Sequence, residues 1–195
     1  YEKYKGQGLV VIGVHTPEFS VEKQEDNVRW AIGAMQIPYE IAMDNEYKIW
    51  RAFNNNYWPA AYLIDARGRV RYHHFGEGGY EETEEKIQLL LAEANGGPVA
   101  KGLVSVRGQG AEAAADWGNL RSPENYVGYQ RSRGFASPGG LVANEARSYT
   151  APAKMRLNQW ALAGNWTAGK EALVLNQAGG RIVYRFHARD VNLVM

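Results

Sequence analysis

The chain has 195 residues, no cysteine and a formal net charge of +1. Without cysteine, these residues by themselves hold no disulfide framework, no thiolate metal site and no catalytic thiol. No run is long and apolar enough for a transmembrane helix, the opening YEKYKGQG is not of the targeting type, and the near-neutral charge points to no particular partner.

Charge divides the chain into two parts. Residues 1–96 hold 10 Lys and Arg against 15 Asp and Glu, a net charge of −5, whereas residues 97–195 hold 12 against 6, a net charge of +6. This asymmetry predicts two domains. The basic residues of the second part are scattered among apolar ones, which indicates a solvated face, and no nucleic-acid partner is expected.

The first part predicts alternating helices and strands. Residues 1–8 have the composition of a helix end, and Leu9–Val14 is a continuous apolar run, typical of a parallel strand buried on both faces. An amphipathic helix is expected over Ser20–Met35 and a second strand within Ile37–Met43. Asp44 is placed to cap a short helix that follows.

The most informative stretch is Asn54–Gly76, NNNYWPAAYLIDARGRVRYHHFG. It predicts a turn, a strand containing Tyr62–Ile64, a tight turn at Gly68 and a returning strand. Pro59 stands before the first of these strands, where the ladder does not need its N–H. The Trp58–Pro59 peptide bond is expected to be cis.

A last helix of the first part is predicted over Tyr80–Asn95, with glutamates in its first turns. We therefore place one domain at residues 1–96, a linker at 97–119 and a second domain at 120–195. The second domain has short β-type runs between Gly, Pro and Asn clusters, which predicts part of an all-β sandwich of jelly-roll type. The segment 178–180 is expected to join two of its strands as a hairpin.

The motif YWPAAYLID-x-x-G, together with the order of helices and strands expected around it, resembles the thioredoxin-like domain of DipZ-type proteins, relatives of the TlpA and ResA reductases. The resemblance covers most of Tyr1–Asn95. Farther along, LNQW, GNW and the closing ARDVNLV resemble the carbohydrate-binding-module-like domain that follows in those proteins. The resemblance implies an α/β thioredoxin-like domain lacking its first strand and its CxxC, then an incomplete β-sandwich, so a chain truncated at both ends is expected.

The resemblance also implies a function. In this family one thiolate attacks a target disulfide and a second thiol resolves the mixed disulfide. The chain is therefore expected to be part of an extracytoplasmic thiol–disulfide oxidoreductase, periplasmic or of the cell envelope, in disulfide reduction or cytochrome c maturation, without a cofactor. Its expected partners are a disulfide-bearing protein or a membrane electron-transfer domain. Alone, without the thiols, the chain is expected to be inactive, and to be stable only with missing fragments of the same protein or as a strand-exchanged homodimer.

Three residues of the first domain are candidate site residues. By resemblance, the loop of Trp58 and Pro59 faces the redox pair and offers backbone groups to a substrate peptide, as in strand addition; the alternative is a structural turn proline. Glu18, in HTPEF, is a candidate acid near the thiols, where a carboxylate would raise a thiol pKa and accept a proton. The alternative for Glu18 is an exposed acid near a helix start.

In the second domain, Trp160 and Trp166 are candidates for a sugar-stacking platform together with two tyrosines, Tyr126 and Tyr129. The alternative, favoured by the strand-like alternation with leucines, is that the indoles belong to a core. Two rival functions stay open: a non-enzymatic module or adaptor that recognises glycan or a protein through the second domain, and a redox-inactive thioredoxin-like adaptor. No metal site is expected, because the adjacent pair His73-His74 points to opposite faces of a strand.

Overall fold

The computed structural model describes residues 1–106, 108–110, 113–114 and 116–194. These residues form two compact units, Tyr1–Ala115 and Asp116–Met195. Across the described ranges, no helix has the length and apolar character needed to cross a bilayer.

The first unit alternates helices and strands, as predicted. Its elements in chain order are η1 (Lys5–Gln7), β1 (Ile12–His15), η2 (Ser20–Lys23), α1 (Glu25–Ala34), β2 (Glu40–Met43), α2 (Lys48–Ala52), β3 (Ala60–Ile64), β4 (Val70–Phe75) and α3 (Tyr80–Asn95). The helix expected from Ser20 begins at Glu25 instead, because Gln24 has an extended backbone that separates η2 from α1.

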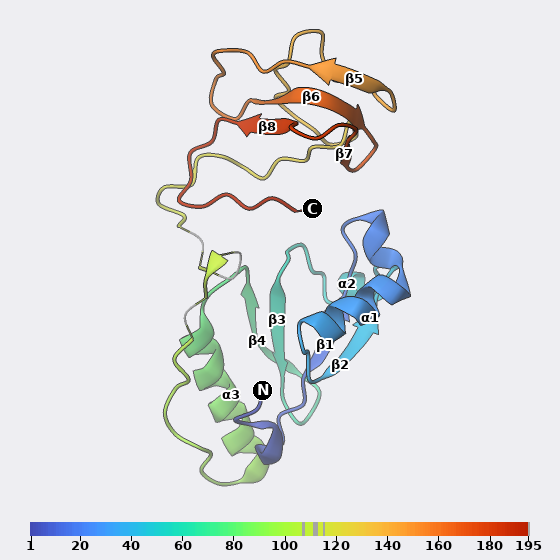
Figure 1. Cartoon of the computed structure of the whole chain (residues 1–195). Coiled ribbons are helices and arrows are strands. Elements are labelled where there is room, and N and C mark those ends of the chain that lie inside the picture. The colour runs from blue at the N-terminus through green and yellow to red at the C-terminus, as the bar shows by residue number, and fades with distance from the viewer. Residues whose placement is uncertain (107, 111–112, 115, 195) are drawn as a thin grey trace. The chain divides into compact units, whose positions relative to one another are not determined.

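The strands of this unit form two separate pairs (Figure 1). β1 and β2 are parallel, with Ile12 opposite Glu40, which confirms the expected parallel strand. β3 and β4 form the antiparallel hairpin predicted around Gly68, with Ala60 opposite Phe75. Within the described ranges no ladder joins one pair to the other, so β1 and β3 each have a free edge.

The apolar run that contains β1 is less covered than its sequence predicts. Val10 is 77% exposed, Ile12 63% and Val14 44%. Ile12 and Val14 are two residues apart in β1 and so lie on the same face of the sheet, and Val10 precedes the strand in the same apolar run. The expectation of a strand buried on both faces is wrong for this structure, because no element of the described unit covers that face.

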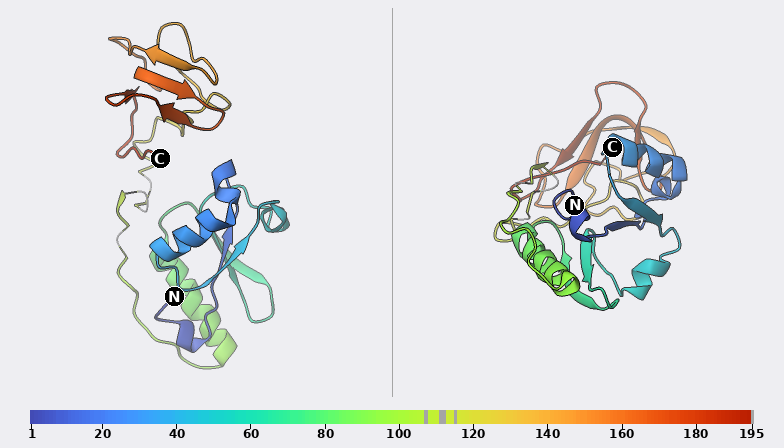
Figure 2. Two further views of the ribbon diagram at one scale, coloured as in Figure 1. Left: turned by 45° about the vertical axis from the view of Figure 1, so that its right-hand side comes forward. Right: turned by 90° about the horizontal axis from the view of Figure 1, so that it is seen from below.

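Helix α3 ties together the beginning and the end of the first unit. The N-terminal segment lies along it (Figures 1 and 2), where Asn95 donates a hydrogen bond to the Gln7 carbonyl. The segment after the helix returns beside it: the amide of Ala100 donates to Gln7 Oε1 at 3.0 Å. Part of the expected linker is therefore bonded into the first unit; its residues 107, 111–112 and 115 lie outside the described ranges.

The second unit is an antiparallel sheet, which agrees with the all-β character expected from the sequence. Its strands are β5 (Ala146–Tyr149), β6 (Trp160–Ala168), β7 (Leu173–Leu175) and β8 (Arg181–Tyr184). The long strand β6 is central: β5 and β7 pair with its second half and β8 pairs with its first half (Figure 1).

The segment 178–180 does not make the predicted hairpin. Strands β7 and β8 do not pair with each other in the described part of the chain; both pair with β6. Along that edge the amide of Asn176 donates to the Asn165 carbonyl, and the amide of Arg185 donates to the Gln159 carbonyl. The prediction failed because β6 is nine residues long, enough to pair with both short strands in succession.

The core of the second unit is aromatic. Tyr149, Trp160, Leu162 and Trp166 are its buried members. The Phe135 ring meets the Trp160 indole edge-on, with 4.7 Å between ring centroids. Such edge-to-face contacts are favourable beyond the apolar area that they bury.

Candidate functional site

The turn before β3 carries two of the predicted site residues. The Trp58–Pro59 peptide bond is cis, as predicted. Both residues are exposed. The Pro59 carbonyl accepts a hydrogen bond from the amide of Gly76, where β4 ends, at 2.9 Å. The backbone N–H and carbonyl of Trp58 have no hydrogen-bond partner among the described residues. The turn therefore presents one free donor and one free acceptor on an exposed backbone.

The side chain of Trp58 is held by two contacts. Its indole Nε1 donates a hydrogen bond to the Thr16 carbonyl at 3.1 Å, across 42 positions of the sequence. Its ring lies against the Trp50 ring of α2, with 4.2 Å between centroids and 37° between planes. The position of the turn is therefore set by the segment after β1 and by α2, two parts that are distant in sequence.

A buried carboxylate fixes both of those parts. Asp44 accepts hydrogen bonds from the amides of Ile49 at 3.0 Å and Trp50 at 2.8 Å. The Thr16 hydroxyl donates to the same carboxylate at 3.4 Å. Burial acts to raise the pKa of Asp44, but these donors outweigh it and the pKa lies below its ordinary value. Asp44 makes the capping bonds expected of it and also connects α2 to the residue that holds Trp58.

Glu18 lies in the segment that Asp44 and Trp58 organise. Pro17, just before it, is fully buried, and the Pro17 carbonyl accepts a hydrogen bond from the Tyr47 hydroxyl. Glu18 itself is partly exposed, and its amide donates to the Glu22 carboxylate at 2.7 Å. The structure thus places Glu18 two residues after the carbonyl that binds the Trp58 indole. No thiol of this chain is available for Glu18 to act on.

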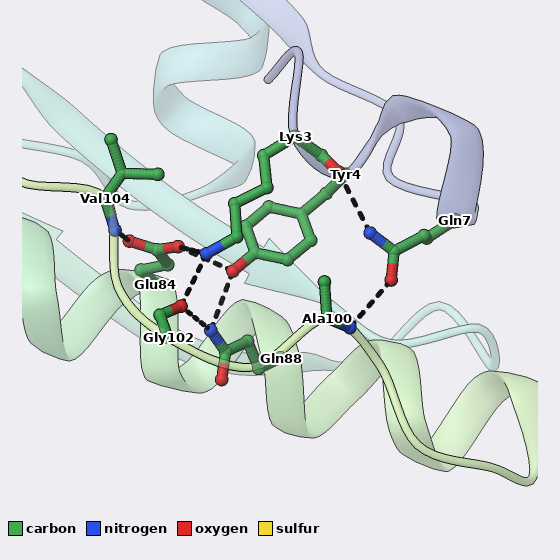
Figure 3. Close-up of polar contacts among 8 residues, drawn as sticks. All are labelled: Lys3, Tyr4, Gln7, Glu84, Gln88, Ala100, Gly102 and Val104. Atoms are coloured by element: carbon green, nitrogen blue, oxygen red, sulfur yellow. Dashed lines mark hydrogen bonds and ion pairs between the residues drawn. The ribbon is translucent and has the colours of Figure 1, made fainter.

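A second charged cluster, missed by sequence reasoning, surrounds Glu84 of α3 (Figure 3). Its carboxylate accepts hydrogen bonds from the Lys3 ammonium at 2.6 Å, the Tyr4 hydroxyl at 2.6 Å and the Val104 amide at 2.6 Å. Burial opposes ionisation, but these three donors hold the pKa of Glu84 down at about 2. No spacing in the sequence indicates this cluster, because its members come from three distant segments.

The Glu84 cluster extends to the next turn of α3. Gln88 donates to the Tyr4 hydroxyl at 2.7 Å and to the Gly102 carbonyl at 2.8 Å. Figure 3 shows the N-terminal segment, the helix and the returning segment meeting at these groups. The Glu84 carboxylate, the Lys3 ammonium and the Tyr4 hydroxyl all have partners within the unit, so the cluster acts as a structural clasp.

The two tryptophans proposed as a sugar platform are in the core. Trp160 is 1% exposed and Trp166 is 7% exposed. A stacking platform needs a ring face open to solvent, and neither indole has one. The structure supports the alternative that both indoles belong to the core. The expectation that Trp160 and Trp166 stack on glycan is therefore wrong. Tyr126 and Tyr129 remain nearer the surface.

The histidines do not converge. His73 is exposed and stacks on Phe75, whereas the Nε2 atom of His74 is buried. His15 Nε2 lies 2.9 Å from the Glu22 carbonyl. In the ranges that the structure describes, no group of three or more His, Cys, Asp and Glu side chains is arranged to hold a metal ion.

Comparison with known proteins places the chain among thioredoxin-like proteins. A family model described as the thioredoxin-like C-terminal domain matches residues 122–195. The DipZ proteins of Mycobacterium tuberculosis and Mycobacterium bovis are 35% identical over all 195 residues, which span 27% of their length.

Two further comparisons each cover about half of this chain. The thiol-disulfide oxidoreductase YkuV of Bacillus subtilis is 29% identical over 92 residues, 47% of this chain and 62% of that protein. A solution structure of a thioredoxin-like protein in the oxidised form is 29% identical, with a TM-score of 0.43, and the match covers 48% of this chain and 62% of that one.

Proposed function

Because this chain is a thioredoxin-like polypeptide of the DipZ type, we propose that it is part of an extracytoplasmic thiol–disulfide oxidoreductase that reduces disulfides and serves cytochrome c maturation. The observation that carries the proposal is the exposed Trp58–Pro59 turn, whose Trp58 backbone groups are free. An extended peptide next to this turn gains a backbone hydrogen bond to each group, as in strand addition.

The chemistry needs two thiols that this chain does not contain. A thiolate attacks one sulfur of the target disulfide and expels the other as a thiolate, which leaves a mixed disulfide. A second thiol then displaces the target, which departs reduced, and the two catalytic sulfurs end as a disulfide. Two electrons must be returned for the next cycle, and we assign that step to a membrane electron-transfer domain.

We place the thiols on a strand and helix that fit between β1 and β3. The free edges of these two strands support this placement, since a strand between them would pair with both. The exposed side chains of Val10, Ile12 and Val14 offer a face for the helix to cover. In this arrangement the segment 16–18 and the Trp58–Pro59 turn would border the thiols, and Glu18 would raise a thiol pKa and accept its proton.

The free edges of β1 and β3 also support a proposal about what the isolated chain binds. An uncovered apolar strand recruits another strand. We propose that the isolated 195-residue chain completes its sheet with other fragments of the same protein or with a second copy of itself. The rival function, a glycan-binding module built on Trp160 and Trp166, loses its support because both residues are buried.

Turnover of insulin with dithiothreitol tests the function. The 195-residue chain alone should show none. A fusion that places a strand and a CxxC-bearing helix of the DipZ type before Tyr1 should reduce insulin catalytically, and a matched fusion with SxxS should not. A folded CxxC fusion without activity above the SxxS control would overturn the proposal.

A further inference from the structure

Two loops of the second unit border a pocket that the proposed redox function does not use. The pocket has a volume of about 510 Å³, within the usual range for sites that bind small ligands. Its walls are the loops 123–126 and 130–133, together with Asn158, just before β6, and Tyr184 of β8. The pocket is therefore large enough for a small ligand or for the end of a peptide chain.

Hydrogen bonds within the unit hold both loops in place. The amide of Arg133 donates to Asn125 Oδ1 at 3.2 Å, which joins one loop to the other. The indole of Trp160, in the core, donates to the Ser132 hydroxyl at 3.1 Å. A ligand would therefore enter a preformed site and would lose little affinity to the ordering of its walls.

One wall of the pocket carries backbone groups that are free to bind a peptide. The backbone amides and carbonyls of Glu124 and Asn125, both lining residues, have no hydrogen-bond partner among the described residues. Gln130, on the other loop, adds a side-chain amide that offers both a donor and an acceptor. Each peptide group of a ligand donates one N–H and accepts at one carbonyl. This lining therefore matches a peptide backbone.

A cation at the pocket is free to bind a carboxylate. Arg133 is exposed, and its guanidinium has no hydrogen-bond or ion-pair partner in the part of the chain that the structure describes. The other lining guanidinium, of Arg131, lies over the Tyr126 ring at 3.7 Å. The lining carboxylate of Glu124 accepts a hydrogen bond from the Tyr126 hydroxyl at 3.1 Å. Arg133 is thus open to a ligand, and its planar fork of N–H groups matches the geometry of a carboxylate.

The pocket also has an apolar part. Pro123 and Tyr184 line it, and the Tyr184 ring is stacked on Phe186 with 5.8 Å between ring centroids. The contact with Phe186 fixes the tyrosine ring as a flat, rigid wall, which suits an apolar side chain. One cavity therefore offers a free cation, free backbone groups and an apolar wall. These are the complements of a carboxylate, a peptide group and an apolar side chain.

We propose that this pocket binds the C-terminal residue of a peptide whose last side chain is apolar. Arg133 binds the terminal carboxylate, and the backbone of Glu124 and Asn125 pairs with the last peptide group. The last side chain packs against Pro123 and Tyr184. Capture of a C-terminal carboxylate is a recurring mode of peptide recognition. The proposal does not depend on the redox function, because binding in this pocket needs no thiol.

Titration of the 15N-labelled 195-residue chain tests this with two peptides that differ by one group. N-acetyl-alanyl-phenylalanine ends in a carboxylate, and its C-terminal amide is neutral. The acid should shift the NMR signals of the amides of 124–126 and 130–133 saturably. The neutral peptide should bind at least about tenfold more weakly, since it lacks the charge-assisted hydrogen bonds to Arg133. 3-Phenylpropanoate, which has the carboxylate and the ring without a peptide group, should also bind at least about tenfold more weakly.

Two variants complete the test. Arg133→Gln should weaken binding of the acid about tenfold or more and leave binding of the neutral peptide unchanged. Arg181→Gln removes the same charge from β8 outside the pocket and should bind both peptides as the wild type does. The comparison of the two peptides needs the wild-type chain alone, so it decides the matter even where a variant does not fold.

The proposal is overturned by the absence of saturable shifts, by equal affinity for the acid and the neutral peptide or 3-phenylpropanoate, or by equal losses in the two variants when both keep the wild-type spectrum. Glucuronate, a sugar that carries a carboxylate, is the remaining control. If glucuronate binds as tightly as the acid peptide, the pocket does not recognise a peptide and the proposal is likewise overturned. Insulin turnover, which measures the redox function, is unaffected by any of these results.

Discussion

The hydroxyl of Tyr4 donates a hydrogen bond to the Glu84 carboxylate at 2.6 Å, across 80 positions of the sequence. The same carboxylate accepts from Lys3 and from the amide of Val104. One side chain of α3 therefore fastens the first and last segments of the first unit.

Protonation of Glu84 should weaken the first unit. Its pKa is about 2 in the folded chain, against an ordinary value of 4.5. The folded-state pKa is the lower one, so the stabilisation is complete above about pH 4.5 and is lost as the pH falls towards about 2. We expect Glu84→Gln to lower the free energy of unfolding at neutral pH and to flatten its dependence on pH in this window. Urea titration followed at the Leu91 amide by NMR measures both.

Glu85→Gln is the matched control for that experiment. Glu85 is the next residue of α3, and its side chain is exposed, whereas that of Glu84 is buried. The free energy of unfolding of Glu85→Gln should depend on pH as that of the wild-type chain does. A Glu84→Gln variant whose stability falls with acid as steeply as that of Glu85→Gln would show that the clasp contributes nothing.

Removal of the Asp44 carboxylate should loosen the Trp58–Pro59 turn. Asp44→Ala leaves the amides of Ile49 and Trp50 without their acceptor, and each buried, unsatisfied amide costs about 1–3 kcal/mol. We expect lower stability of the first unit and faster exchange of the Trp58 indole N–H. Asp44→Asn keeps one acceptor oxygen and should cost less. If the Trp58 indole N–H exchanges at the same rate in the wild type and in Asp44→Ala, Asp44 does not hold the turn in place.

A methyl group at Gly180 should destabilise the second unit. A Cβ there would lie 2.2 Å from Leu175 Cδ1 and 2.9 Å from the Trp166 ring. Overpacking of this kind typically costs about 1–3 kcal/mol, so Gly180→Ala should lower the melting temperature of the second unit. At Gly118 the added Cβ would meet its nearest atom at an ordinary 3.7 Å. Gly118→Ala should therefore melt like the wild type, and a Gly180→Ala variant that does the same would contradict the packing described here.

A charge on β1 should reduce self-association of the isolated chain. Ile12 is exposed on the uncovered face of β1, and edge strands with charged side chains resist pairing with other chains. Light scattering should find the wild-type chain larger than one copy and Ile12→Lys shifted towards the monomer. Val174→Lys, at an exposed position of β7, is the control and should not shift. A cooperatively melting wild-type monomer would contradict the proposal that the sheet is completed by another strand.

Local signals in the sequence predicted most of the first unit. The hairpin around Gly68, the cis bond before Pro59 and the capping bonds of Asp44 follow from turn chemistry and short-range pattern. The Glu84 clasp could not be predicted, because it depends on side chains that only the fold brings together. The pairing of β7 and β8 with one strand was missed for a related reason: a short loop between two β-type runs indicates a hairpin unless the length of a third strand is considered.

The central claim is that a disulfide-bearing peptide meets this chain at the Trp58–Pro59 turn while the thiols come from a segment between β1 and β3. A CxxS form of the fusion, with a strand and helix placed before Tyr1, traps the mixed disulfide with a cysteine-containing peptide. In an NMR comparison of free and trapped protein, we predict protection of the Trp58 backbone amide from exchange and shifted signals at residues 16–18 and 57–60. A trapped complex in which the Trp58 amide exchanges as in the free protein, with its shifts confined to other residues, would contradict the account.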